Sequence, residues 1–206
     1  MKRNYPKLTN RNLNRARKIL FDITEFLENN NIDYHLEGGT LLGIVRDNDL
    51  LPWDHDVDLS ISIDDSEKFA KLSNKMFFKG YRITKGKIYK DFKVFKKGQY
   101  RIFKVKKIFP SIIKVVFPYI NKYTIVADIF VKTSDEKNTY WQAMEKMMMV
   151  SNKYYSSHEI VNFMNRDLRV PYDYKNYLTE KYGDWKIPVK NWVCGNDERT
   201  IIGNVN

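Results

Sequence analysis

The first third of the chain alternates hydrophobic and polar positions in patterns that predict a helix, a short strand and a second helix. Between about Thr9 and Asn29, apolar residues recur at spacings of three and four, which is typical of a helix with one buried stripe: Leu13, Ala16, Leu20, Ile23 and Leu27. A short strand is expected from Asp33 to Glu37, a turn at residues 38–40, and the first turns of a helix from Leu41 to Val45.

The next segment, DVDLSISI at residues 56–63, alternates polar and apolar residues over eight positions. This period predicts a half-buried strand that presents Asp56, Asp58, Ser60 and Ser62 on one face. A helix is then expected from Asp64 to about Phe78, with Gly80 as its stop.

Further strands are predicted at residues 81–84, 87–95, 100–108 and 125–131, the last being the most apolar. The remainder is expected to be mainly helical and to end in a helix over residues 173–182, capped by Asp173 and terminated by Gly183. The fold class is therefore α+β: a mixed sheet flanked by helices, with a mainly helical C-terminal part. A length of 206 residues suits a single domain over residues 1–206.

Charge and cysteine content bear on the partners and on the cellular compartment of the protein. The net charge is +11, and residues 79–122 hold 14 Lys or Arg against Asp91 alone, a net of +13 that leaves −2 for the rest. This basic segment is either a solvated face or a contact for an anionic partner such as a membrane surface. The single cysteine, Cys194, excludes an internal disulfide, and no export signal is visible, so a cytoplasmic protein, with peripheral membrane contact as an alternative, is expected.

The apolar stretch from Ile108 to Ile120 is too short to span a bilayer, which needs about 20 residues. A buried element or a loop against the core is expected there, with interfacial membrane contact as the alternative.

The candidate chemistry begins with Asp56 and Asp58. Two carboxylates two positions apart on a strand point the same way and can share a divalent cation, which suits magnesium. Alone, such a pair is often only a feature of an exposed strand. The preceding Gly38 and Gly39 let the backbone approach a phosphate closely, the helix N-terminus after them offers free N–H groups, and Thr40 adds a hydroxyl donor.

Asp128 is the candidate for a third carboxylate, because it interrupts the apolar strand IVADIFV, where an uncompensated charge is costly. The alternative is a salt bridge with a lysine. Three carboxylates and a glycine-rich anion cradle would supply the cation bridges and the donors that phosphoryl transfer needs.

Read together, three blocks resemble the LicD family, which includes the fukutin-related proteins: GGTLLGIVRDNDLLPWDHDVDLSI (38–61), ADIFV (127–131) and VPYDYKNYLTEKYGDW (170–185). The resemblance covers about residues 12–188. It implies a nucleotidyltransferase fold and transfer of a substituted phosphate, such as phosphocholine or an alditol phosphate, from a CDP-linked donor to a hydroxyl of a cell-surface glycan or its precursor, with release of CMP.

Carried over by position, the resemblance assigns the metal-binding and catalytic roles to Asp56, Asp58 and Asp128, with Mg²⁺, or Mn²⁺ in its place, expected as two ions. It assigns the donor phosphate to Gly38, Gly39, Thr40 and Arg46. One of the three carboxylates, with Asp128 as the first candidate, is expected to take the hydroxyl proton. The alternative for Arg46 is a salt bridge with Asp47 or Asp49.

Other residues, inside and outside these blocks, are given lesser roles. His55 replaces an acidic residue found in many relatives and, by strand alternation, is expected to face away from the aspartates. Asp54 is expected to position a loop, and His35 and His158 to be structural. The aromatic residues of the last block are expected to pack first, with stacking on a cytosine as an alternative.

The expected partners are the CDP-linked donor, a glycan or lipid-linked glycan acceptor, and an anionic membrane at residues 79–122; no nucleic acid is expected. Two other functions stay open: transfer of NMP from an NTP, which the same metal site could serve, and a non-catalytic basic module that binds an anionic polymer or membrane.

Overall fold

The computed structural model describes residues 6–108 and 125–205, and its centre is a mixed sheet. In the N-terminal half the elements are α1 (Arg11–Glu28), β1 (Tyr34–Leu36), α2 (Gly38–Asp47), β2 (Asp56–Ser62), α3 (Ile63–Lys71), α4 (Ser73–Phe78), β3 (Tyr81–Lys87) and β4 (Tyr100–Lys107). The second half contains β5 (Val126–Ser134), β6 (Asn138–Ala143), β7 (Lys146–Ser151), η2 (Asn152–Tyr154), β8 (His158–Phe163), β9 (Arg166–Pro171), α6 (Tyr174–Tyr182), α7 (Cys194–Asp197) and β10 (Ile201–Asn204).

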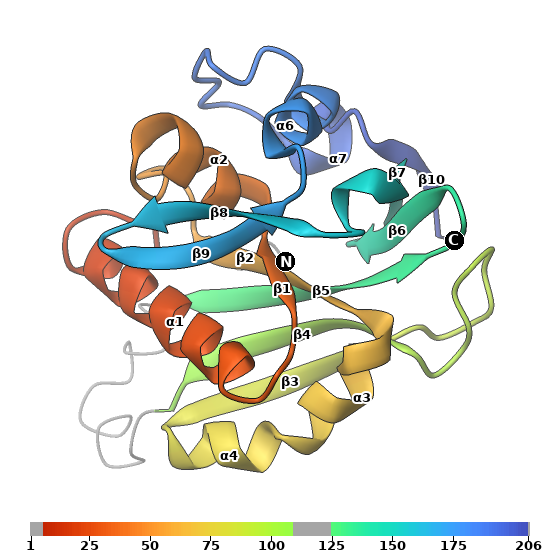
Figure 1. The fold of residues 1–206 in the computed structure, drawn as a ribbon, viewed down its shortest axis with the longest axis horizontal. Helices are drawn as coiled ribbons and strands as arrows, with labels where there is room; N and C mark the ends of the chain where they lie inside the picture. Colours follow the sequence, from red (N-terminus) through yellow and green to blue (C-terminus); the bar gives the residue numbers. More distant parts are fainter. Residues whose placement is uncertain (1–5, 109–124, 206) are drawn as a thin grey trace.

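The sheet joins strands that are distant in sequence. β2 pairs with β5 in parallel, β1 pairs with β2 and β4 pairs with β5 in antiparallel fashion, and β3 forms an edge on β4. The last residues of β5 turn onto β6, which continues to β7 and β10. β8 and β9 form a separate hairpin (Figure 1). The mixed sheet flanked by helices, predicted from the sequence, is confirmed.

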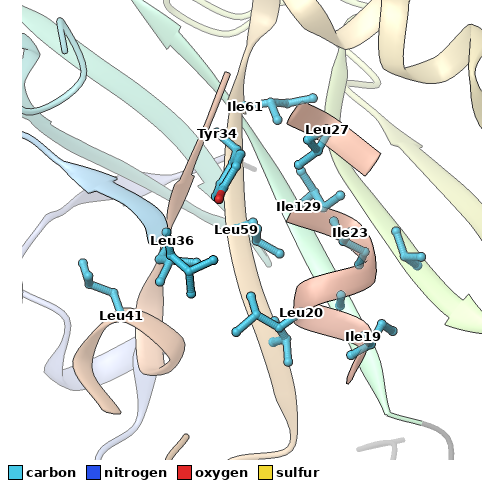
Figure 2. Close-up of a cluster of buried hydrophobic side chains, with 14 of the residues drawn as sticks. Ile19, Leu20, Ile23, Leu27, Tyr34, Leu36, Leu41, Leu59, Ile61 and Ile129 are labelled. Atoms are coloured by element: carbon cyan, nitrogen blue, oxygen red, sulfur yellow. The ribbon is translucent and has the colours of Figure 1, made fainter. Parts of the chain in front are cut away.

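The main core lies between α1 and the sheet. The apolar stripe of α1 packs on β2 and β5, where Leu20, Ile23 and Leu27 meet Leu59 and Ile129, all of them fully buried (Figure 2). Burying one such side chain contributes about 1.5–3 kcal/mol, so this layer fixes the position of β2. Because side chains alternate along β2, its core-facing residues leave Asp56 and Asp58 on the opposite face.

Several predicted boundaries are wrong. The three residues Gly38, Gly39 and Thr40 are the first turn of α2 rather than a turn before it, and the helix predicted over residues 64–78 is two helices that meet at Leu72. Residues 88–95 form a loop with one isolated bridge, Phe92 to Phe95, because Ile88 and Phe95 pack into a small second core with residues of β6 and β7.

The prediction of a mainly helical C-terminal part is also wrong. Most of residues 138–171 lie in the strands β6 to β9. The methionine-rich run of β7 has good helix propensity, but pairing with β6 and burial of Met147 and Met148 outweigh it. The turn of the β8–β9 hairpin consists of Met164 and Asn165, both with positive φ, so it lacks the glycine that usually signals such a turn.

The basic segment at residues 79–122 is only partly described: its first part forms β3, β4 and their connecting loop, and the apolar stretch Ile108–Ile120 lies, beyond its first residue, outside the described ranges. Within residues 6–108 and 125–205, no helix combines the length and the apolar character needed to cross a bilayer.

Candidate active site

Three charged residues form a row across the sheet. In the register of the strands, Asp58 of β2 lies opposite Asp128 of β5, and Asp128 lies opposite Lys104 of β4. Residues paired in this way have side chains on the same face. The third carboxylate predicted from the sequence is therefore beside the first pair, and Asp56 precedes Asp58 by one step of the same face.

Asp128 also makes the salt bridge that was the alternative for this residue. Its Oδ2 accepts a short hydrogen bond from the Lys104 ammonium, while its Oδ1 is buried and has no hydrogen-bond partner among the described residues. Both interpretations of Asp128 thus describe part of its surroundings: one oxygen is paired with a lysine and the other is unsatisfied.

The two glycines make room for carboxylates. Gly38 has φ +52°, and a Cβ atom there would overlap the Asp58 carboxylate; a Cβ on Gly39 would overlap the carboxylate of Asp54. The first N–H groups of α2 have no acceptor inside the helix, and Gly38 and Gly39 line the cavity described below. A close backbone approach was predicted, but the nearest neighbours of these glycines are aspartates.

Thr40 does not reach the cavity. It is buried, and its Oγ1 accepts a hydrogen bond of 2.9 Å from the backbone N–H of Asp58. Since the Glu37 N–H also donates to the Asp58 carbonyl at 3.0 Å, the start of α2 holds the strand at Asp58 from both sides. Thr40 therefore positions Asp58, and its predicted hydroxyl contact with a phosphate finds no support in this geometry.

A cavity of about 690 Å³ opens on this row. Gly38 and Gly39 form part of its wall, and its charged lining includes Asp54, Asp56, Asp58, Asp128, Arg46, Arg101, Lys104 and Lys190. Its aromatic lining includes all four tryptophans of the chain together with Phe130 and Tyr182: Trp53, Trp141, Trp185 and Trp192. We call Asp54, Asp56, Asp58 and Asp128 the acidic floor, and the tryptophans with Phe130 and Tyr182 the aromatic wall. Together they suit a ligand with a charged part and a ring-shaped part.

The pKa values of three carboxylates of the floor are raised, chiefly by burial. Burial, followed by the charges of Asp54 and Asp128, raises the pKa of Asp56 to about 8. Burial and the same group of neighbours, Asp56 first, hold the pKa of Asp58 well above its usual range. The pKa of Asp54 is raised as well, chiefly by burial. Such a group favours either protons or a cation.

The donor set fits a hard divalent cation in chemistry. Asp56 and Asp58 offer carboxylate oxygens from one strand, and the unpartnered Asp128 Oδ1 is a third such oxygen on the neighbouring strand. In the described ranges, however, no three His, Cys, Asp or Glu side chains already converge as a metal-binding cluster. A cation would thus be held by Asp56 and Asp58, with Asp128 as a ligand that Lys104 now engages.

This charge arrangement gives a pH prediction. The pKa of Asp56 is about 8 in the folded protein and about 3.9 in an unfolded chain, so between these pH values the folded state binds more protons. The free energy of unfolding of the cation-free protein should therefore receive a contribution from Asp56 that falls as pH rises from about 4 to about 8. Magnesium binds the ionised form, so the stabilisation it provides should grow over the same range.

The measurement is urea denaturation at pH 5.5 and pH 8, with EDTA or with magnesium. Asp56→Asn is the control, because it cannot ionise and should reduce both trends. An unchanged pH dependence in this variant would show that Asp56 does not carry the effect.

Arg46 lines the cavity, but the nitrogens of its guanidinium already have hydrogen-bond partners. Its Nε and Nη2 donate to Asp47 at 2.7 and 2.8 Å, its Nη1 donates to the Trp185 carbonyl at 3.3 Å, and it lies over the ring of Trp53. The hydrogen bond from Arg46 holds the pKa of Asp47 below its usual range. The salt bridge with Asp47, given as the alternative for Arg46, is therefore present in the structure.

His55 contributes to the cavity lining, whereas its side chain is predicted to face away from Asp56 and Asp58. β2 begins at Asp56, and strand alternation does not extend back to His55. Its backbone N–H donates to the Asp54 carboxylate at 2.8 Å, and its Nδ1 is buried without a hydrogen-bond partner among the described residues. Asp54 does shape this loop, as predicted, but its carboxylate also joins the acidic floor.

A buried ionic network supports the start of α2. Glu37 accepts hydrogen bonds from Ser60 at 2.9 Å, Tyr177 at 2.7 Å and Tyr155 at 2.5 Å, and Lys132 Nζ lies 3.3 Å from its Oε1. Burial alone would raise the pKa of Glu37, but Lys132 and Lys181 outweigh it and lower that pKa. The network joins α2 and β2 to α6, whose last residue, Tyr182, lines the cavity.

The remaining predicted residues are structural. His35 contacts the Ser157 carbonyl at 3.1 Å and packs against Tyr155 and His158. Asp173 occupies the N-cap position of α6 in a left-handed conformation, but its side chain makes no cap hydrogen bond; Gly183 does end the helix, with φ +74°.

Three groups of site residues were not assigned to the site by the sequence. These are Asp54 as a member of the acidic floor, Arg101 and Lys104 of β4, and the tryptophans. The two basic residues belong to a segment with 14 positive charges, so nothing in the sequence distinguishes them; strand pairing with Asp128 identifies Lys104, and the cavity lining identifies Arg101.

Several known proteins are similar to this chain. The profile of the family described as "LicD/FKTN/FKRP, nucleotidyltransferase domain" matches residues 31–173. The ribitol 5-phosphate transferases FKRP of Homo sapiens and Mus musculus are each 54% identical over 39 residues, 19% of this chain and 8% of theirs. An uncharacterised protein of Rickettsia typhi is 40% identical over 72 residues, 35% of this chain and 23% of its own.

The chain thus spans less than a third of the length of the curated relatives it matches. Among solved structures, a complex of ANT(2")-Ia with adenylyl-2"-tobramycin aligns over 86% of this chain and 81% of that one, at 15% identity and a TM-score of 0.43. At that score the assignment of the fold rests on the family match.

Proposed function

Because the chain belongs to the LicD/FKTN/FKRP nucleotidyltransferase domain family, we propose that it is a metal-dependent phosphotransferase that moves a substituted phosphate from a CDP-linked donor to a glycan hydroxyl. The observation that carries the proposal is the row formed by Asp58 and Asp128, with Asp56 beside it, under a cavity of about 690 Å³. The names of the FKRP relatives, ribitol 5-phosphate transferases, support an alditol phosphate as one candidate for the transferred group.

In the proposed reaction, the oxygen of the acceptor hydroxyl attacks the phosphorus that bears the substituent. The bond from this phosphorus to the oxygen that bridges the two phosphates breaks, CMP leaves with that oxygen, and the hydroxyl proton passes to a carboxylate of the floor. Magnesium, when bound, would supply positive charge to the phosphate oxygens during this exchange.

The residues of the chain have distinct tasks in this proposal. Asp56 and Asp58 would hold the cation, with Mn²⁺ as a substitute for Mg²⁺ and room in the acidic group for a second ion. Asp128, one oxygen of which has no partner in the described part of the chain, is the candidate to take the proton. The N–H groups of Gly38 and Gly39 would donate to a phosphate oxygen.

The cytosine of the donor suits the aromatic wall. Trp185 and Trp192 follow α6 in sequence and line the cavity with Trp53 and Tyr182. Rings of this kind bind a planar base by stacking at little cost in conformational entropy. The acceptor would then enter from the side that these rings leave open.

The proposal is tested by a thermal-shift screen of CDP-choline, CDP-ribitol, CDP-glycerol, CTP and ATP, each with magnesium. A ligand at a hundred times its dissociation constant stabilises the folded state by about 2.7 kcal/mol, which is a shift of several degrees. We expect the largest shift in melting temperature from a CDP-linked compound. This shift should disappear when EDTA removes the magnesium. A response to CTP or ATP alone would contradict it.

The second candidate, transfer of NMP from an NTP, is favoured by the nucleotidyltransferase domain in the family description. There the acceptor would attack the α-phosphorus and pyrophosphate would leave.

A non-catalytic basic module explains neither the buried carboxylates nor the cavity. Contact of residues 79–122 with an anionic membrane stays a prediction, supported by exposed lysines such as Lys90, Lys93 and Lys96.

A further inference from the structure

Strand β4 places two cationic side chains in the wall of the cavity, Arg101 and Lys104. Lys104 is next to the acidic floor, since it is the cross-strand partner of Asp128 and its ammonium binds one oxygen of that carboxylate. Arg101, three residues earlier, is half-buried; the negative charge of Asp128 acts on its guanidinium, but no hydrogen bond or ion pair joins that guanidinium to any residue within 6–108 or 125–205. A half-buried guanidinium whose hydrogen-bond donors are unsatisfied is costly and is thus a candidate for ligand contact.

The acidic floor makes such cations necessary. The carboxylates of Asp54, Asp56, Asp58 and Asp128 all face the space in which an anionic nucleotide would bind. Neighbouring like charges repel strongly when they are partly buried. A diphosphate therefore requires cationic groups in contact with its own oxygens, in addition to any cation bound by the carboxylates.

Arg46 is poorly placed to supply that charge. Two of its nitrogens bind both carboxylate oxygens of Asp47, and a third contacts a carbonyl, so any phosphate would have to compete with an existing bidentate pair. Lys190 lies over the Trp53 ring, at the aromatic wall, and its position suits the base of the donor rather than its phosphates.

We propose that Arg101 and Lys104 bind the phosphates of the donor, so that the cationic side of the site is on β4 and Arg46 is a structural residue of α2. The inference rests on the proposed function for the identity of the donor. In it, Arg101 binds a phosphate oxygen directly. Lys104 neutralises Asp128 in the free protein and turns to a phosphate oxygen when a divalent cation takes its place beside that carboxylate.

The test is calorimetric titration of cytidine, CMP, CDP and inorganic pyrophosphate in magnesium buffer. Arg101→Gln should weaken CDP and pyrophosphate by at least about tenfold, the loss expected for one hydrogen bond to a charged group, and should leave cytidine unchanged. Arg82→Gln is the matched control, because Arg82 is an exposed residue of the neighbouring strand β3 outside the cavity. Arg46→Gln should affect phosphate binding less than Arg101→Gln.

Lys104 has a second readout that does not need a nucleotide. Lys104→Gln removes the cation that competes for Asp128, so it should raise the affinity for Mn²⁺ by several fold while it weakens CDP; Lys104→Arg should keep the affinity for CDP. Lys107→Gln, at the exposed end of the same strand, is the control for Lys104→Gln. The melting temperature of each variant shows whether it is folded.

Several outcomes would overturn the inference: full CDP and pyrophosphate affinity in Arg101→Gln, equal loss for cytidine, or Mn²⁺ affinity in Lys104→Gln that is unchanged or lower. Failure of the proposed function looks different. If the wild-type protein binds CTP but no CDP-linked compound, and Arg101→Gln weakens CTP, the donor is wrong and the phosphate site stands.

Discussion

Replacing Asp58 with asparagine is expected to abolish transfer and to leave the fold intact. The substitution keeps the size of the side chain and removes one of the proposed cation ligands from the acidic floor. Cation stabilisation of a phosphoryl transition state contributes several kcal/mol, and each 1.4 kcal/mol is about a factor of ten, so kcat should fall by about a thousandfold or more. Asp56→Asn should act in the same way.

Stability separates this loss from unfolding. Asp58 is buried among other carboxylates, and its pKa is held well above the usual range by that burial. A neutral side chain there costs nothing in charge repulsion, so the melting temperature in EDTA should be unchanged or higher. Asp64→Asn, on an exposed position of α3 outside the cavity, is the control and should retain turnover. Full activity in Asp58→Asn would remove the basis of the assigned site.

Gly38→Ala is expected to have the second largest effect. The new Cβ would overlap the Asp58 carboxylate, and φ +52° is disfavoured for alanine by about 1 kcal/mol. The carboxylate must move out of register with Asp128, so the affinity for magnesium and kcat should both fall, the latter by about a hundredfold, because misplacement by 1 Å is that costly. Steady-state kinetics at varied magnesium measure both.

A matched glycine shows whether backbone strain alone is responsible. Gly98 has φ +90°, but a Cβ there would meet no atom within 4 Å. Gly98→Ala therefore carries the same kind of strain without a contact at the site, and it should lose a small amount of stability and no activity. Equal losses of activity in both variants would mean that the approach of Gly38 to Asp58 is not what matters.

Local patterns along the sequence predicted the part of the site that lies on one strand. The alternation in DVDLSISI placed Asp56 and Asp58 on one face, and the stripe of α1 predicted the core that orients them; both are confirmed. Asp128 was inferred from the cost of a charge in an apolar strand, and the structure places it next to Asp58. These inferences succeed because burial of apolar side chains decides which face of a strand is inward.

What the sequence could not show depends on pairing between distant strands. Lys104 reaches the site only because β4 pairs with β5 at Asp128, a register that no local pattern encodes. The aromatic wall depends in the same way on how α6 and the residues after it lie over the sheet. Strand alternation does not extend back to His55, which precedes β2, and β6 to β9 were missed because helix propensity was preferred to long-range pairing.

The most direct test of the account follows the two halves of a CDP-linked donor. A donor with one label in the cytidine and another in the distal phosphate is incubated with the protein, magnesium and a glycan acceptor, and products are separated by mass. The account predicts that the distal phosphate and its substituent appear on the glycan while labelled CMP is released, with no reaction in EDTA or with Asp58→Asn. Cytidine label on the glycan would contradict it.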